Sequence, residues 1–254
     1  MPFCVIKSKT IKIALAMILV AVLLTLSIEG SSAASVFFGN SSRKVPIYRV
    51  QTEEKQVAIS FDAAWGADKT EEILEVLSSY NATATFFLVG FWVDKYPEMV
   101  TKIDEAGMEI GTHSNTHPDM VKLDSETIKK ELETSTTKIE NLTGKEVSLF
   151  RAPYGSYNNT LLSTCESLGL TTIQWDVDSL DWKGLSSVEV TTRVLDRVQN
   201  GSIILCHNNA DNVVESTKMI LERLTMKGYK VTCVGDLIYH DNFVVDNNGV
   251  QSLK

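Results

Sequence analysis

Cysteine is scarce in this chain of 254 residues, and its four cysteines show no CxxC spacing. Cys4 lies in an N-terminal segment unlike the rest of the chain, which leaves Cys165, Cys206 and Cys233. An odd number of cysteines without regular spacing does not describe a disulfide framework. We expect these three side chains to be buried free thiols.

Basic residues are outnumbered, with 24 Lys and Arg against 32 Asp and Glu and a formal net charge of −8. Removal of residues 1–34, which carry three lysines and one glutamate, would take the net charge to −10. An acidic domain argues against binding nucleic acid or anionic lipid through a basic surface. We therefore expect no nucleic-acid partner.

Several enzyme motifs are absent. The sequence contains no GxSxG, no P-loop and no GxGxxG, and Cys206 falls inside an apolar, strand-like run. The sequence therefore gives no sign of a serine or cysteine nucleophile, or of a nucleotide-binding loop.

Only one long hydrophobic run is present, residues 13–28, after three lysines and before the small residues of 30–34. A charged region, an apolar region and a small-residue cleavage site are typical of an export signal. As a helix this run would span about 24 Å, short of a bilayer core of about 30 Å. We expect residues 1–34 to be a signal peptide or a membrane anchor of an exported protein, with membrane contact only through residues 13–28.

The rest of the chain divides into a linker or arm at 35–54, one domain at 55–240 and a C-terminal tail at 241–254. Within the domain, nearly continuous apolar runs alternate with helix-like stretches, which indicates an α/β fold with a parallel sheet. Seven such units fit either a doubly wound sheet or a (β/α) barrel. Strands are predicted at 57–61, 84–89, 108–112, 147–151, 171–177, 202–207 and 230–234, and helices at 70–79, 96–105, 125–142, 159–168, 188–198 and 213–226.

Polar side chains follow the predicted strands where each strand ends. Active sites of parallel α/β proteins form at this edge of the sheet. A carboxylate base, a separate imidazole and a histidine pair suit metal-assisted attack of water on a carbonyl. Each residue could instead have a purely structural role; Arg151, for example, could form an ion pair with Asp178 or Asp181. The candidates are Asp62, His113, His117, Arg151, Tyr154, Asp176, Asp178, Asp181, Trp182 and His207.

The ordered series FDAAWG, HSNTH, RAPYG, DSLDW and LCH resembles the five motifs of the polysaccharide deacetylases, the NodB-homology domain of carbohydrate esterase family 4. It covers roughly residues 55–235 in the same order. The resemblance implies a distorted (β/α)7 barrel that removes acetyl groups from N-acetylated sugars. The FDAAWG form is similar to a sporulation-associated subgroup, which implies peptidoglycan of the cell wall or spore cortex as substrate.

The resemblance also implies roles for residues at the matching positions. Asp62 matches the base that deprotonates water, and His207 matches the acid that protonates the leaving amine. Arg151 matches the residue that orients the base, with Asp178 as its partner. Tyr154 matches the position whose backbone N–H helps to hold the oxyanion.

The same resemblance also implies which residues form the acetyl pocket and which bind a metal ion. Trp182 and Leu205 match the walls of the pocket for the acetyl methyl group, and His113 and His117 match two ligands of a divalent metal, zinc first. The family's third ligand is an aspartate, but this chain has Ala63 there, so we expect the metal to be weakly bound or absent.

Three functions therefore compete: a working deacetylase with a weak metal site, a cell-wall glycan-binding protein with impaired catalysis, and a hydrolase of another small amide or ester. The presence of both Asp62 and His207 favours the first, because a pure binding protein needs neither proton-transfer group.

Overall fold

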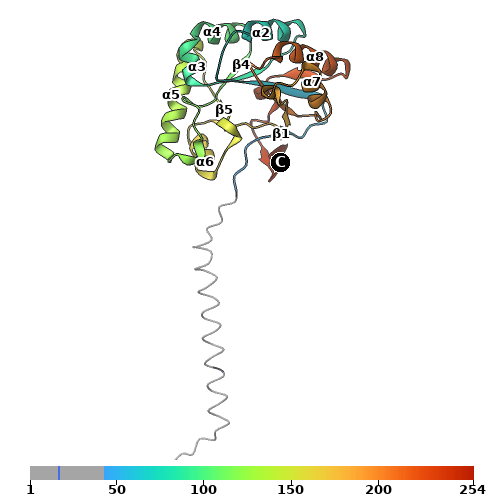
Figure 1. Cartoon of the computed structure of the whole chain (residues 1–254). Helices are drawn as coiled ribbons and strands as arrows, with labels where there is room; N and C mark the ends of the chain where they lie inside the picture. Colours follow the sequence, from blue (N-terminus) through green and yellow to red (C-terminus); the bar gives the residue numbers. More distant parts are fainter. Residues whose placement is uncertain (1–16, 18–42) are drawn as a thin grey trace, which may run out of the picture. The chain divides into compact units, whose positions relative to one another are not determined.

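Parallel strands form the centre of the molecule in a computed structural model, which describes residue 17 and residues 43–254 (Figure 1). The sheet runs in the order β6-β5-β4-β3-β2-β8-β7, and β9 pairs with β2 off this path. Every pairing in it is parallel, which confirms the predicted α/β class. Its strands are β2 (Gln56–Ala63), β3 (Thr85–Leu88), β4 (Glu109–Thr112), β5 (Leu149–Phe150), β6 (Thr171–Thr172), β7 (Val177–Asp178), β8 (Ile203–His207) and β9 (Lys230–Thr232).

Helices surround the curled sheet (Figure 1). In α5, Asp124 accepts a hydrogen bond from the Thr127 N–H at the start, and Gly144 takes a left-handed conformation (φ 67°) at the end. Such caps satisfy backbone groups that a helix end leaves without a partner. The helices are α2 (Thr70–Ser79), α3 (Gly90–Lys95), α4 (Pro97–Glu105), α5 (Ser125–Thr143), α6 (Asn159–Ser167), α7 (Ser187–Leu195), α8 (Val213–Met226) and α9 (Val234–Leu237).

The predicted strand 171–177 is wrong as a single element. Its first residues form β6 beside β5, and its end forms β7 beside β8, at the opposite edge of the sheet. Between them, the Gln174 N–H donates to the Ile47 carbonyl, and the Asp176 carboxylate accepts from the Ser202 hydroxyl and the Ile203 N–H. These hydrogen bonds hold the segment that connects the two edges of the sheet, and the sheet closes like a barrel across it.

A second, small sheet joins the two ends of the described domain. β1 (Arg49–Val50) pairs in parallel with β11 (Val250–Leu253), which pairs antiparallel with β10 (Phe243–Val245). Gln251 is fully buried within it. Residues expected in an arm and a tail therefore pack together on the domain. The predicted export segment, 1–34, lies outside the described residues except for Met17, and no described helix has the length and apolarity to cross a membrane.

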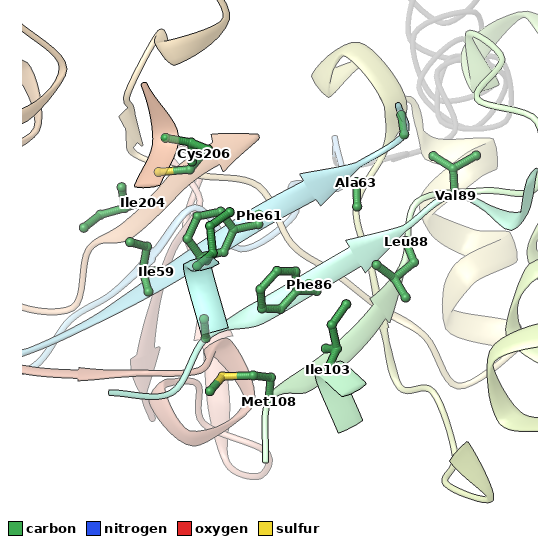
Figure 2. Packing of buried hydrophobic residues seen from close by; sticks show 14 of the residues in the cluster. Ile59, Phe61, Ala63, Phe86, Leu88, Val89, Ile103, Met108, Ile204 and Cys206 are labelled. Carbon is green, nitrogen blue, oxygen red and sulfur yellow. The ribbon is translucent and has the colours of Figure 1, made fainter. Parts of the chain in front are cut away.

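The core explains which side chains of β2 reach the inside of the barrel. Ile59, Phe61 and Ala63 alternate along one face of the strand and pack in the main core cluster (Figure 2). The Phe61 ring stacks on Phe86 of β3 with centroids 5.0 Å apart. Because successive strand residues point to opposite faces, Ser60 and Asp62 lie on the other face. The core therefore fixes Asp62 at the inner mouth of the barrel.

Candidate active site

A pocket of about 710 Å³ opens at the carboxyl ends of the strands. Asp62 and His207 are register partners on the neighbouring strands β2 and β8, so both side chains emerge at the same level. The structure brings together most of the residues that the sequence singled out, while Arg151 lies buried beneath them. The predicted residues that line the pocket are Asp62, His113, His117, Tyr154, Asp178, Asp181, Trp182, Leu205 and His207.

Arg151 is fully buried and holds Asp62 directly. Its Nη1 donates to Asp62 Oδ1 at 2.8 Å and to Ser60 Oγ at 2.9 Å, and its Nη2 donates to the Gln174 carbonyl at 3.2 Å. The guanidinium also lies 4.1 Å from the centre of the Phe87 ring. A buried cation needs this many partners because removal from water is costly. Asp62 is thus fixed by a buried, hydrogen-bonded ion pair.

The predicted partnership of Arg151 with Asp178 is wrong. Asp178 Oδ1 accepts from the Leu180 N–H at 2.9 Å, and its backbone carbonyl accepts from Arg193 Nε at 2.7 Å. The Asp178 carboxylate therefore supports the turn after β7, while both terminal nitrogens of Arg151 are taken by groups inside the barrel. Within this turn Leu180 adopts a left-handed conformation (φ 54°), and its N–H is the donor to Asp178.

Asp181 is the acid that holds His207. Its Oδ1 accepts from His207 Nδ1 and its Oδ2 from the His207 backbone N–H, both at 2.8 Å. Since a carboxylate only accepts, Nδ1 carries the hydrogen and Nε2 is left for the pocket. Burial alone would lower the pKa of His207, but the hydrogen bond and the charge of Asp181 raise it above its ordinary value.

The pKa of Asp62 moves in the opposite direction. Burial alone would raise the pKa of this carboxyl, but Arg151 and then His113 outweigh burial and hold it below its ordinary value. The site therefore pairs an ionised carboxylate with an imidazole that readily carries a proton. Two titrating groups whose environments separate their pKa values are typical of an acid–base pair.

The two histidines after β4 lie edge to face, with ring centres 4.9 Å apart. His113 Nδ1 donates to the Arg151 carbonyl at 2.8 Å, so its Nε2 points away, 3.6 Å from Asp62 Oδ2. Burial and then His113 lower the pKa of His117 to about 4. Burial also lowers the pKa of His113, so the surroundings of both imidazoles favour the neutral form.

The loop that carries these histidines has a strained backbone, with positive φ at Ser114 (68°) and His117 (58°). Such conformations persist in non-glycine residues when the surroundings fix them. Glu131 of α5 does so, because its carboxylate accepts from the N–H groups of Asn115 and Thr116 at 2.9 and 2.8 Å. The Ser114 hydroxyl accepts from the His117 N–H at 3.0 Å.

The wall next to the histidine loop is built around a further residue with positive φ, Tyr154 at 61°. Gln174 Nε2 donates to the carbonyl of the next residue, Gly155, at 3.1 Å, and a Cβ on Gly155 would lie 3.0 Å from the Trp175 ring. The loop therefore needs a glycine there. The Tyr154 ring meets His117 edge to face at 4.7 Å, which places it at the pocket mouth.

Several site residues have supporting roles that the sequence analysis did not assign. Asp181 was a candidate, but two acids three positions apart in DSLDW gave no means of choosing between them before the turn was known. Ser60, Gln174 and Glu131 act through contacts with residues far away in the sequence, and no local pattern marks such contacts. Trp65 also lines the pocket. In the sequence, only its position directly after the FDAA stretch, three residues from Asp62, indicates a role in the site.

Fold and site together define a barrel-like α/β protein with an acid and an imidazole at the carboxyl ends of neighbouring strands. A polysaccharide deacetylase family model matches residues 49–173. The solved structure of wild-type BA3943, described as a pseudoenzyme of the CE4 family from Bacillus anthracis, is 33% identical with a TM-score of 0.74, over 76% of this chain and 68% of that one. The chain belongs to the polysaccharide deacetylase family, which confirms the resemblance and the predicted barrel.

Two curated relatives come from Bacillus subtilis. The uncharacterized protein YlxY is 34% identical over 76% of this chain and 60% of its own length. The peptidoglycan-N-acetylmuramic acid deacetylase PdaC is 31% identical over 74% of this chain and 40% of its own length. The chain therefore spans less than two thirds of either relative.

Deacetylases of this family are in general metal-dependent, but the residues present here do not complete a metal site. His113 and His117 supply two imidazoles. Ala63 is fully buried at the end of β2 and supplies no ligand atom, and the alanine that lines the pocket is the next residue, Ala64. Within the described part of the chain, no three His, Cys, Asp or Glu side chains are arranged to hold an ion.

Proposed function

We propose that this protein hydrolyses the N-acetyl groups of amino sugars in peptidoglycan. The observation that carries the proposal is the Asp62–His207 pair, an ionised carboxylate and a protonatable imidazole side by side at the pocket floor. Relatives named as peptidoglycan deacetylases support the choice of substrate. Because peptidoglycan lies outside the cell membrane, the proposal includes export through the predicted segment 1–34.

In the proposed reaction, Asp62 takes a proton from water, whose oxygen attacks the carbonyl carbon of the acetamide. Arg151 keeps the carboxylate ionised and aimed into the pocket. The backbone N–H of Tyr154 donates to the oxygen that becomes negative, and such a donor contributes about 3 kcal/mol in other acyl-transfer sites. The imidazolium of His207 then gives its proton to the nitrogen and the C–N bond breaks, which releases the free amine and acetic acid; the acid passes its proton to the neutral imidazole and leaves as acetate.

The roles of the flanking residues follow from their positions. Leu205, which is buried, and Trp182 form the walls against which the acetyl methyl group lies. Asp181 keeps the Nδ1–H tautomer of His207, so that Nε2 carries the transferable proton. No step of this scheme is assigned to a metal ion.

The second candidate is a glycan-binding protein with impaired catalysis. The incomplete set of metal donors favours it, as does the similarity to a structure described as a CE4 family pseudoenzyme. A mutant of that neighbour is described as having restored enzymatic activity. The same fold and pocket are therefore compatible with either outcome.

Amine release from N-acetylated peptidoglycan, with and without added zinc, distinguishes the two candidates. We expect release by the wild type, a loss of at least a hundredfold in Asp62→Asn, and no change in Asp196→Asn, an exposed carboxylate at the end of α7. Binding of the glycan without release by the wild type under every metal condition would support the second candidate and refute the first.

A further inference from the structure

The exposed aromatic side chains of the described domain gather at one place. Trp65, Tyr154 and Trp182 are 60%, 68% and 59% exposed, and no other aromatic residue in 43–254 ranks among the exposed large hydrophobic side chains. All three line the catalytic pocket. Exposed apolar side chains scattered singly need no explanation, but a cluster of rings around a pocket marks a binding surface.

Trp65 stands on a rigid support. The carbonyl of the next residue, Gly66, accepts two buried side-chain N–H groups, Trp92 Nε1 at 2.6 Å and Asn208 Nδ2 at 2.9 Å. The Trp65 ring meets His117 edge to face at 5.2 Å and lies 6.4 Å from Phe91. The backbone is therefore fixed while most of the indole stays open to solvent, and a ring held in place loses little conformational entropy when a ligand binds.

The two tryptophans stand on opposite sides of the Asp62–His207 pair. Trp65 leans on Phe91 and His117, which follow β3 and β4, whereas Trp182 follows β7 and stands next to Asp181, the partner of His207. In the sheet, β3 and β4 lie on one side of β2 and β8, and β7 lies on the other. A ligand that touches both indoles must therefore extend across the reacting centre.

The charge of the pocket limits which ligands can bind there. Its lining includes four aspartates, Asp62, Asp178, Asp181 and Asp211, and no Lys or Arg occurs among its described lining residues. Like charges disfavour an anionic ligand. A neutral molecule with flat apolar faces and polar edges, such as a chain of N-acetylated sugar rings, fits both the indoles and the carboxylates.

We infer that Trp65 is a stacking platform for a sugar ring on the side of the reacting centre opposite Trp182, so that the pocket selects neutral N-acetylated oligosaccharides over single sugars. The inference rests on the proposed function for its choice of a sugar ligand, but it concerns binding and does not require turnover. Removal of Trp65 should weaken the binding of a long chain and leave the binding of one sugar unchanged.

Isothermal titration of the full chain with N-acetylglucosamine and with penta-N-acetylchitopentaose tests this inference. We expect the wild type to prefer the pentamer, Trp65→Ala to weaken pentamer binding about tenfold, and Trp65→Phe to recover most of it. The matched control is Met226→Ala, since Met226 is 71% exposed at the end of α8 and far from the pocket lining. Unchanged melting temperatures show that the variants fold.

Pentamer binding by Trp65→Ala equal to that of the wild type would overturn the inference, as would a wild type that binds neither sugar. These outcomes are distinct from failure of the proposed function. If the protein binds the pentamer through Trp65 but releases no amine from peptidoglycan, the inference about Trp65 is supported and the proposed deacetylase function is refuted.

Discussion

Replacement of Arg151 by methionine tests whether the ion pair with Asp62 organises the site. Arg151 is fully buried, and Asp62 is only 7% exposed. Methionine fills much of the same volume but removes the cation that is hydrogen-bonded to the carboxylate, which leaves the imidazoles of His113 and His207 as neighbours that can carry a positive charge. Loss of one member of a buried pair costs about 3–5 kcal/mol because the remaining charge stays buried. For a domain of this size we expect the melting temperature to fall by roughly 6–20 °C.

The loss of stability should depend on pH with a definite sign. In the wild type the pKa of Asp62 is lowered, so the ion pair stabilises the fold above the ordinary pKa of Asp and is lost as pH falls. In Arg151→Met, burial without the cation raises the pKa of Asp62. The carboxyl then becomes neutral at mildly acidic pH, and each pH unit below its raised pKa, down to the ordinary pKa of Asp, removes about 1.4 kcal/mol of the penalty.

Urea unfolding of wild type and Arg151→Met at pH 7 and at pH 4.5 measures both quantities. The free-energy difference between them should be largest at pH 7 and clearly smaller at pH 4.5. Arg197→Met is the matched control, because Arg197 is exposed on the surface after α7, and it should change stability by less than about 0.5 kcal/mol. An equal difference at both pH values would refute the assigned role of the buried charge.

Two further predictions concern the other half of the site and the metal. Asp181→Asn should lower the pKa of His207, because burial then acts without the neighbouring charge, and should lower it more than Asp178→Asn does; NMR titration of the imidazole measures both, and equal shifts would contradict the pairing. Ala63→Asp should bind zinc more tightly than the wild type, and its buried carboxylate should lower the melting temperature in chelator and make zinc strongly stabilising. Calorimetry and thermal melting measure these effects, and equal zinc affinity of the two proteins would contradict the account of the missing ligand.

The sequence was sufficient for the parts of the fold that local patterns determine. The apolar run before Asp62 predicts a buried strand, and β2 extends it only to 56–63. Ile128, Leu132 and Ile139 at helical spacing predict α5, which ends one residue beyond the expected boundary. Because parallel strands share one polarity, the rule that their carboxyl ends meet also brings Asp62 and His207 into one pocket.

Features that depend on register and on distant partners were not accessible in this way. Residues 171–177 are a continuous β-like run, yet the bonds of Gln174 and Asp176 to other segments divide it between two edges of the sheet. Likewise, either acid of DSLDW was a reasonable partner for Arg151. Only the left-handed turn at Leu180 decides that Asp178 holds the turn while Asp181 reaches His207.

The alanine in place of the family's metal-binding aspartate affects only part of the site. Asp62 is held by Arg151, and His207 is held by Asp181. The side chain of residue 63 takes part in neither contact. Ala63 is fully buried at the last position of β2, directly before the pocket-lining Ala64. The Arg151–Asp62 and Asp181–His207 contacts do not involve residue 63, so a change at position 63 should alter zinc affinity while the Asp181–His207 hydrogen bond stays intact.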